Sequence, residues 1–175
     1  IRGITRKVGG GVDSLLRVVT PQTLPADVSS QREILVAVLN GVVGDYLLAT
    51  GNPLRISMQL RRDGVALELT PEAIAATVPE ATGKILVMVH GLCMCDLQWQ
   101  RRGHNHGELL SAEAGFTPVY LHYNSGLHIS TNGREFSDKL EALVEAWPVP
   151  VEQLVIIGYS MGGLLTRSAC EDARK

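Results

Sequence analysis

The chain has 175 residues, enough for one domain or most of one, and its apolar content of 45% is ordinary for a globular protein. Its 16 basic and 18 acidic side chains leave a net charge of −2. That balance gives no electrostatic reason for binding to nucleic acid or to a membrane surface. The composition therefore fits an ordinary globular domain.

Residues 1–52 are predicted to form a helical segment. Within it, Ser30-Gln31-Arg32-Glu33 matches a capping box, in which serine and glutamate satisfy free backbone N–H groups at a helix start. The pattern predicts a helix from Ser30 to about Ala49, and Gly51 fits the glycine that commonly ends a helix.

Apolar side chains nearly encircle this predicted helix, so it must be buried against something. The residues that interrupt the apolar run are Arg32, Glu33, Asn40 and Asp45. Their presence argues against a membrane span. We expect the helix to dock on the rest of the chain, where Gly41 and Gly44 permit close packing at some cost in helix propensity. Contact with lipid and a seam between two copies are the alternatives.

Strands and helices alternate in the rest of the chain. Residues 54–62 and 65–69 are predicted to form a hairpin around Asp63-Gly64, a strong turn signal. The units that follow are strand 84–90, a helical stretch within 97–114, strand 117–122, helix 133–147, strand 152–158 and helix 161–173. This alternation predicts an α/β fold, with a mostly parallel sheet that carries helices on both faces. The predicted domains are a helical segment over 1–52, packed on the core, and an α/β domain over 53–175.

Gly158-Tyr159-Ser160-Met161-Gly162 is the most informative motif, and it directly follows the apolar run 153–157, which reads as a short buried strand. It has the form Gly-x-Ser-x-Gly, in which a strand ends in a sharp turn that lifts a serine onto a helix N-terminus. The turn strains the serine backbone, and Gly158 and Gly162 remove side chains that would collide there. Free N–H groups at the start of the next helix can stabilise an oxyanion. The motif predicts a nucleophilic Ser160, with a glycine-rich structural turn as the alternative.

A second apolar run, 84–89, leads directly into His90-Gly91-Leu92-Cys93. A serine hydrolase with such a turn needs a second backbone donor from the loop after an earlier strand, and Gly91 lets the main chain approach the reacting carbonyl. We assign the two oxyanion donors to the N–H groups of Leu92 and Met161. We expect His90 to shape the loop rather than to act as the base, because motif residues must match geometric roles.

The stretch from Ile85 to Arg167 resembles the α/β-hydrolase fold, and within it the bacterial lipases and esterases. The segments that carry the resemblance are Val89-His90-Gly91-Leu92, Leu97-Gln98-Trp99, the run 120–126 and Gly158-Tyr159-Ser160-Met161-Gly162-Gly163. Such lipases often have histidine before the nucleophile, where this chain has Tyr159, and the difference bears on packing or substrate fit. The resemblance implies a carboxylic-ester hydrolase that acts on a small-molecule ester or lipid and uses no metal or organic cofactor.

In that fold the catalytic acid and histidine follow the serine in the chain. Beyond Ser160 this sequence continues only to Lys175, and Glu171 and Asp172 lie about 15 Å along the predicted helix, too far to orient a base. The chain also begins at Ile1 rather than at methionine. We therefore expect an N-terminal fragment whose acid and histidine lie in a missing C-terminal part, and we expect association with that part or with a dimer partner.

Several other residues have the chemistry for a site. Cys93, Cys95 and Cys170 match no usual zinc spacing, and we expect packing rather than redox chemistry from them. His104 and His106 share a polar segment flanked by glycines. A metal site there would need an acidic or thiolate partner that the sequence does not place, whereas a solvated loop or helix cap needs none.

Residues 123–128 follow strand 117–122 at its carboxyl end, where open α/β sheets place their ligands. His128 is therefore an alternative base for Ser160, although the chain order disfavours it. Met94 and Trp99 are candidates for lining an acyl pocket, with ordinary packing as the alternative.

These observations predict that Ser160 attacks an acyl carbonyl while a histidine takes its proton and an acid orients that histidine. Water then releases the acyl group. The alternatives are an acyltransferase or thioesterase that uses the same serine, and a binding module that keeps the turn without a working triad.

Overall fold

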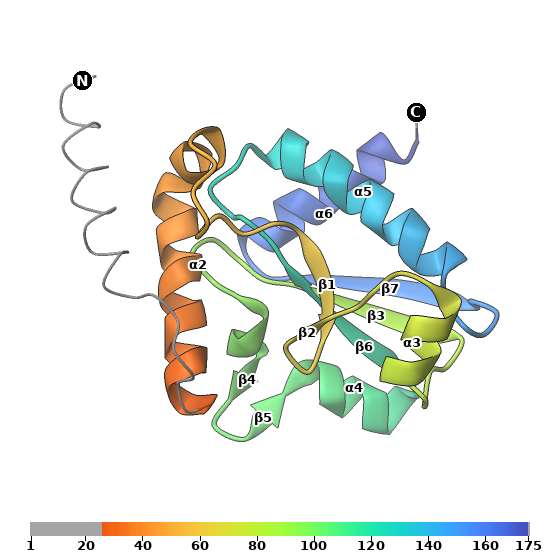
Figure 1. Cartoon of the computed structure of the whole chain (residues 1–175). Helices are drawn as coiled ribbons and strands as arrows, with labels where there is room; N and C mark the ends of the chain where they lie inside the picture. The colour runs from red at the N-terminus through yellow and green to blue at the C-terminus, as the bar shows by residue number, and fades with distance from the viewer. Residues whose placement is uncertain (1–25, 175) are drawn as a thin grey trace, which may run out of the picture. The chain divides into compact units, whose positions relative to one another are not determined.

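The computed structural model describes residues 26–174, with side chains from residue 29 onward. One compact unit, Arg32–Lys175, is built around a five-stranded sheet with the strand order β2-β1-β6-β3-β7 (Figure 1). Its strands are β1 (Gln59–Arg62), β2 (Val65–Ala66), β3 (Lys84–Val89), β6 (Thr117–His122) and β7 (Gln153–Gly158). A separate ribbon joins β4 (Gln100–Arg101) to β5 (His104–Asn105). The helices are α2 (Ala26–Ala49), α3 (Pro71–Thr77), α4 (His106–Ala114), α5 (Ile129–Glu145), α6 (Met161–Asp172) and the 3-10 helix η1 (Asp96–Trp99).

The sheet is mixed, with a parallel centre and an antiparallel hairpin at one edge. Strands β6, β3 and β7 run parallel, whereas β1 pairs antiparallel with both β6 and β2. Asp63 and Gly64, between β1 and β2, have φ angles of 51° and 76°, as the tight hairpin turn requires. The predicted α/β fold and its hairpin are thus confirmed.

Helices cover both faces of the parallel strands. Alternate residues of β3 point to opposite faces, as a pleated strand requires. Ile85, Val87 and Val89 pack in one core with Phe136 of α5 and Leu165 of α6. On the opposite face, Leu86 and Met88 form a second core with Tyr120, and Trp99 of η1 and Leu110 of α4 pack against it. The helices fall on opposite faces because the chain leaves β3 in one direction, to β6, and then returns across β3 to β7.

Helix α2 docks against the loops that follow β3 and β6. A Cβ built on Gly41 would lie 2.9 Å from Cys93 Cα, and Asn124 Nδ2 donates a 3.0 Å hydrogen bond to Gly44 O. Asn40 is fully buried and donates to Leu54 O while accepting from Ile56 N. The predicted docking through the two glycines is confirmed. Large apolar residues that stay exposed on this helix are Leu35, Val38, Val42 and Leu48.

Several predicted boundaries need correction. The helix expected to start at Ser30 begins at Ala26, so the capping box at Ser30 does not mark its start; it does end at Ala49, before Gly51 with φ 61°. The predicted stretch 97–114 divides into η1, the β4–β5 ribbon and α4. Helix α5 starts at Ile129 and not at 133; it directly follows His128, whose φ of −56° and ψ of 137° are not helical. Any part of the 1–52 segment before residue 26 lies outside the described residues, and the domain boundary after residue 52 stays a prediction.

Two further features differ from the expectation. Helix α3 was not predicted, although Thr70 caps it by accepting from Ala73 N and Pro71 occupies its first turn, the usual start signal. Strand β7 is half-buried rather than buried, because among the described strands it has only β3 as a neighbour. Among residues 26–174, none of the helices combines the length and apolarity needed to cross a membrane.

Candidate active site

Ser160 lies in the tight turn between β7 and α6, with φ 52° and ψ −119°. This left-handed φ is rare for a residue with a side chain and costs about 1–3 kcal/mol, so the surrounding contacts must enforce it. The side chain is exposed at the carboxyl end of the strand. Tyr159 N donates to Val89 O at 2.9 Å, which ties the turn to the end of β3. A strained, accessible serine on a strand-to-helix turn is the geometry of a nucleophile elbow.

The motif glycines are required by close backbone contacts. A Cβ on Gly158 would lie 2.6 Å from Gly163 N, and one on Gly162 would meet Val89 O and lie 2.7 Å from His90 O. Real Cβ atoms do not approach backbone atoms this closely. The two glycines therefore let the first turn of α6 pack directly onto β7 and onto the end of β3.

The loop after β3 lies against the serine. A Cβ on Gly91 would lie 3.3 Å from Ser160 Cβ and 3.3 Å from Tyr159 O. Among the hydrogen bonds of the described residues, none uses the N–H of Leu92 or of Met161. The two predicted oxyanion donors thus belong to segments that meet at Ser160, and their N–H groups are unoccupied within residues 26–174.

The loop is braced from behind. Cys93 has φ 58°, and its N–H donates to Ser125 Oγ at 3.0 Å. Ser125 follows β6, so this bond joins the loops at the carboxyl ends of two neighbouring strands. On its other side the loop contacts α2 at Gly41. The position of the proposed donor at Leu92 therefore depends on long-range contacts.

His90 is a buried structural residue in this arrangement. Its ring is fully buried, stacks on Tyr123 with centroids 4.4 Å apart, and has Nδ1 2.9 Å from Gly91 O. Tyr123 Oη in turn donates to His90 O at 2.8 Å. Burial lowers the pKa of His90 from 6.5 to about 4, so the ring is neutral at neutral pH, with Nδ1 as the donor. These contacts fit the expected role in shaping the loop.

No described histidine contacts the serine hydroxyl. Ser160 Oγ has no hydrogen-bond partner within residues 29–174. The side chain of His128, the alternative base, is exposed beside the start of α5 and makes no hydrogen bond with that part of the chain. Glu171 ion-pairs with Arg174, far along α6. The described residues supply the turn and the backbone donors but no base at Ser160.

The topology places this site where open α/β sheets bind ligands. The connection that leaves β3 runs to α4 on one face, while the connection that leaves β7 runs to α6 on the other. Neighbouring parallel strands whose connections diverge in this way leave a crevice at their carboxyl ends. Gly91 and Ser160 lie in contact at the carboxyl ends of these two strands.

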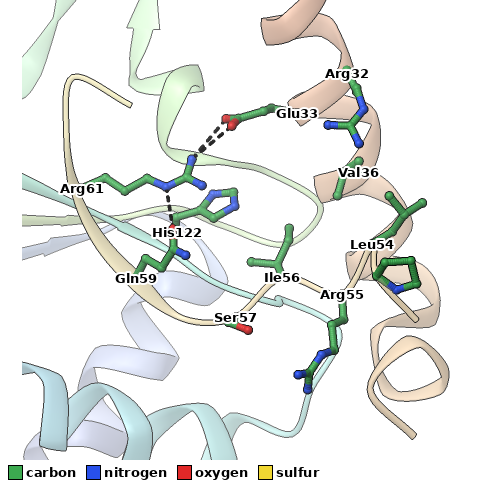
Figure 2. Close-up of a pocket in the computed structure, with 11 residues that line it drawn as sticks. Arg32, Glu33, Val36, Leu54, Arg55, Ile56, Ser57, Gln59, Arg61 and His122 are labelled. Carbon is green, nitrogen blue, oxygen red and sulfur yellow. Dashed lines mark hydrogen bonds and ion pairs between the residues drawn. The ribbon is translucent and has the colours of Figure 1, made fainter. Parts of the chain in front are cut away.

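A buried polar cluster supports the same loop from the opposite side of β3, and the sequence analysis did not identify it. Arg61 of β1 lies 3.2 Å from Glu33 of α2 and 3.3 Å from Asp96 of η1. Figure 2 shows the Arg61 guanidinium between Glu33 and His122, at the wall of a cavity of about 250 Å³. His122 Nδ1 lies 2.9 Å from Asp96 Oδ1.

Asp96 is the centre of this cluster. Burial alone would raise its pKa, but the neighbouring His122 imidazole and the positive charge of Arg61 outweigh burial and hold the pKa below its usual value. The carboxylate is thus ionised and held from two strands, β1 and β6. Because Asp96 directly follows the loop of residues 90–95, the cluster anchors the far end of that loop.

The remaining candidate residues have structural surroundings. Cys95 is fully buried, and burial raises the pKa of its thiol to about 11, so it stays protonated, which fits the expected packing role. The three cysteines are unpaired, and Cys170 is exposed, so the expected packing role is wrong for that residue. His104 Nε2 lies 3.2 Å from His106 Nδ1, but residues 29–174 contain no group of three potential metal ligands. The helix cap in this segment is Asn105, which accepts from Gly107 N.

Met94 and Trp99 line a cavity of about 520 Å³ together with Tyr159. The Trp99 ring lies edge-on to the Tyr159 ring, with centroids 6.4 Å apart. Tyr159 directly precedes Ser160, and Met94 lies in the loop that follows β3, so both segments that meet at the serine contribute to the lining of this cavity. The two residues that the sequence suggested for an acyl pocket are therefore brought together near the candidate nucleophile.

No family model, no curated protein and no solved structure matches the chain. The function must therefore be argued from the site itself.

Proposed function

We propose that this chain carries the nucleophile and oxyanion-binding half of a serine hydrolase of carboxylic esters, of the lipase or esterase type. The observation that carries the proposal is the strained turn at Ser160, packed against the backbone of Gly91. A non-glycine residue in such a conformation is costly, and strained residues cluster at functional sites. If the turn were purely structural, glycine would adopt this positive φ at a lower free-energy cost than serine.

The proposed chemistry follows from the groups that meet at the turn. Ser160 Oγ attacks the acyl carbon, and its proton passes to a histidine held by an acid. The oxyanion that forms accepts hydrogen bonds from the N–H groups of Leu92 and Met161. Losing one such donor commonly raises the barrier by about 3 kcal/mol. The alcohol leaves, and water then releases the acyl group from Ser160.

The described residues place neither a histidine base nor its acid partner at Ser160. We propose that both come from a C-terminal portion outside the sequence or from a partner. The open side of the serine is available for this, because Ser160 is exposed and its hydroxyl is unpaired within the described residues. We also propose that this reaction uses no metal ion.

The test is ester hydrolysis by the protein expressed with the sequence that flanks the chain in its natural gene. A short-chain nitrophenyl ester should be hydrolysed by the wild type and left intact by Ser160→Ala, while both proteins melt at the same temperature. Unchanged turnover in Ser160→Ala would remove the serine mechanism. Adding an alcohol or a thioester tests the alternatives, since an acyltransferase would give a new ester and a thioesterase would prefer the thioester.

A further inference from the structure

The cavity beside Tyr159 has a chemical character that bears on the substrate. Its inner wall is apolar and aromatic, from Met94, Trp99 and Tyr159. Its volume of about 520 Å³ is in the range of small-molecule sites. Its lining includes Met94, from the loop after β3, and Tyr159, which directly precedes Ser160, so the cavity is next to both segments that would hold a substrate at the serine.

Apart from Tyr159, the ionisable residues that line the cavity are basic, and these four side chains are exposed. Arg101 and Arg102 come from the β4–β5 ribbon, and His104 and His106 lie on the strand and helix that follow it. No aspartate or glutamate lines the cavity. In the described part of the chain, neither arginine has a carboxylate within ion-pair distance. Two unpaired guanidinium groups and two imidazoles therefore face one apolar space.

The aromatic wall also contains an unused donor. Trp99 Nε1 is buried and has no acceptor among the described residues. An indole N–H that is kept from water normally has a hydrogen-bond partner, because an unpaired buried donor costs about 1–3 kcal/mol. Because this atom is shielded from water, a bound ligand would accept from it only after the indole ring turned toward the cavity. The basic lining and the lack of acids are the two observations that point to an anionic ligand.

We propose that the ester cleaved at Ser160 carries an anionic oxygen group, a carboxylate or a phosphate, joined to the ester by a short apolar segment that fills this cavity. The inference rests on the proposed function and names its substrate class. Guanidinium groups bind carboxylates and phosphates through paired N–H donors, and the apolar wall excludes a fully polar substrate. Arg101 and Arg102 are the specificity residues in this proposal.

The experiment compares three nitrophenyl esters of matched length: the monoester of glutaric acid, its neutral methyl ester, and a phosphonate analogue. Wild-type protein, expressed with its natural flanking sequence, should show kcat/KM about tenfold higher for the glutarate monoester than for the neutral ester, the size expected for one charge-assisted hydrogen bond. The advantage should shrink in high salt. Comparing the carboxylate with the phosphonate shows which anion the basic lining prefers.

Variants that replace an arginine with neutral glutamine test whether Arg101 and Arg102 bind the anionic group. Arg101→Gln and Arg102→Gln should each reduce the preference for the anionic ester, and the double variant should abolish it while hydrolysis of the neutral ester continues. Arg134→Gln is the matched control, because Arg134 is an exposed residue of α5, on the other face of the sheet. A neutral ester that is cleaved as well as the anionic one, or an undiminished preference in the double variant, would overturn the proposal.

A binding measurement separates this proposal from the hydrolase proposal. Glutarate monoamide has no ester, so its binding does not depend on Ser160 chemistry. It should change the fluorescence of Trp99 in a Trp147→Phe background, with affinity at least about tenfold weaker in the double arginine variant. Binding of glutarate monoamide without ester turnover would support the anion site and contradict the proposed esterase activity. Turnover of neutral esters without such binding would support the esterase activity and contradict the anion site.

Discussion

The backbone of Gly91 lies directly against Ser160: a methyl group built on Gly91 would be 3.3 Å from Ser160 Cβ. The two residues are far apart in sequence but end neighbouring parallel strands, β3 and β7. Their contact brings a candidate nucleophile and a candidate oxyanion loop together, and most of the predictions below depend on it.

Replacing Gly91 with alanine should slow the reaction more than it destabilises the fold. The new methyl group would press on Tyr159 O and Ser160 Cβ, each 3.3 Å away, and displace the loop that holds the Leu92 N–H. We expect labelling by a fluorophosphonate to slow at least about tenfold, since a misplaced oxyanion donor loses most of its effect. Labelling rates with thermal melts of both proteins check this. Wild-type labelling in Gly91→Ala would show that the loop takes no part.

The two glycines at the start of α6 should respond in opposite ways to alanine. In Gly162→Ala the Cβ would meet Val89 O and lie 2.7 Å from His90 O, both backbone atoms, so unfolding free energy should fall by about 1–3 kcal/mol. In Gly163→Ala the nearest atom would be 3.8 Å away, and stability should hold or rise slightly through helix propensity. Urea denaturation of both variants measures the difference. Equal effects would mean that α6 is not packed on the end of β3.

Gly41 of α2 should matter for the loop at the active site. Alanine favours a helix, but its Cβ here would lie 2.9 Å from the N and Cα of Cys93. Because backbone atoms cannot move aside cheaply, we expect Gly41→Ala to lower stability by about 1–2 kcal/mol and to slow labelling of Ser160. Val42→Ala is the control, since Val42 is 70% exposed and should change neither quantity. If Gly41→Ala matched this control, α2 would have no role in bracing the loop.

His90 should make stability depend on pH in mildly acid solution. Its pKa is about 4 in the folded protein and 6.5 when unfolded, so only the unfolded chain binds a proton between these values. The free energy of unfolding should be highest above pH 6.5 and should fall by up to about 3 kcal/mol as the pH drops to 4. Below pH 4, His90 should cause no further loss. Urea titrations of wild type and His90→Asn over this range measure it. The variant should lose this part of the slope; parallel curves would contradict the assignment.

Local patterns predicted much of the structure because they report local physics. The elbow motif, the strand 117–122 and the Asp63-Gly64 turn each depend on residues that are neighbours in sequence. Helix α2 began four residues before Ser30 because a capping pattern can also occur inside a longer helix. The β4–β5 ribbon was missed because its two-residue strands are too short to show alternation.

The polar cluster under the loop could not be predicted in the same way. Arg61, Asp96 and His122 come from three separate elements, and nothing in their flanking residues indicates that they meet. Their register across β1 and β6, where Gln59 pairs with His122, is fixed only once the sheet has formed. Nor does the sequence pattern reveal that Trp99 and Tyr159 share one cavity.

The most direct test of the central claim is intact-mass spectrometry after treatment with a fluorophosphonate, on the protein expressed with its natural flanking sequence. We predict a single adduct, mapped by peptide digestion to the segment that contains Ser160, and no adduct in Ser160→Ala that melts like the wild type. A folded wild-type protein that gains no adduct, or a Ser160→Ala variant that is labelled equally, would contradict the assignment of Ser160 as the nucleophile.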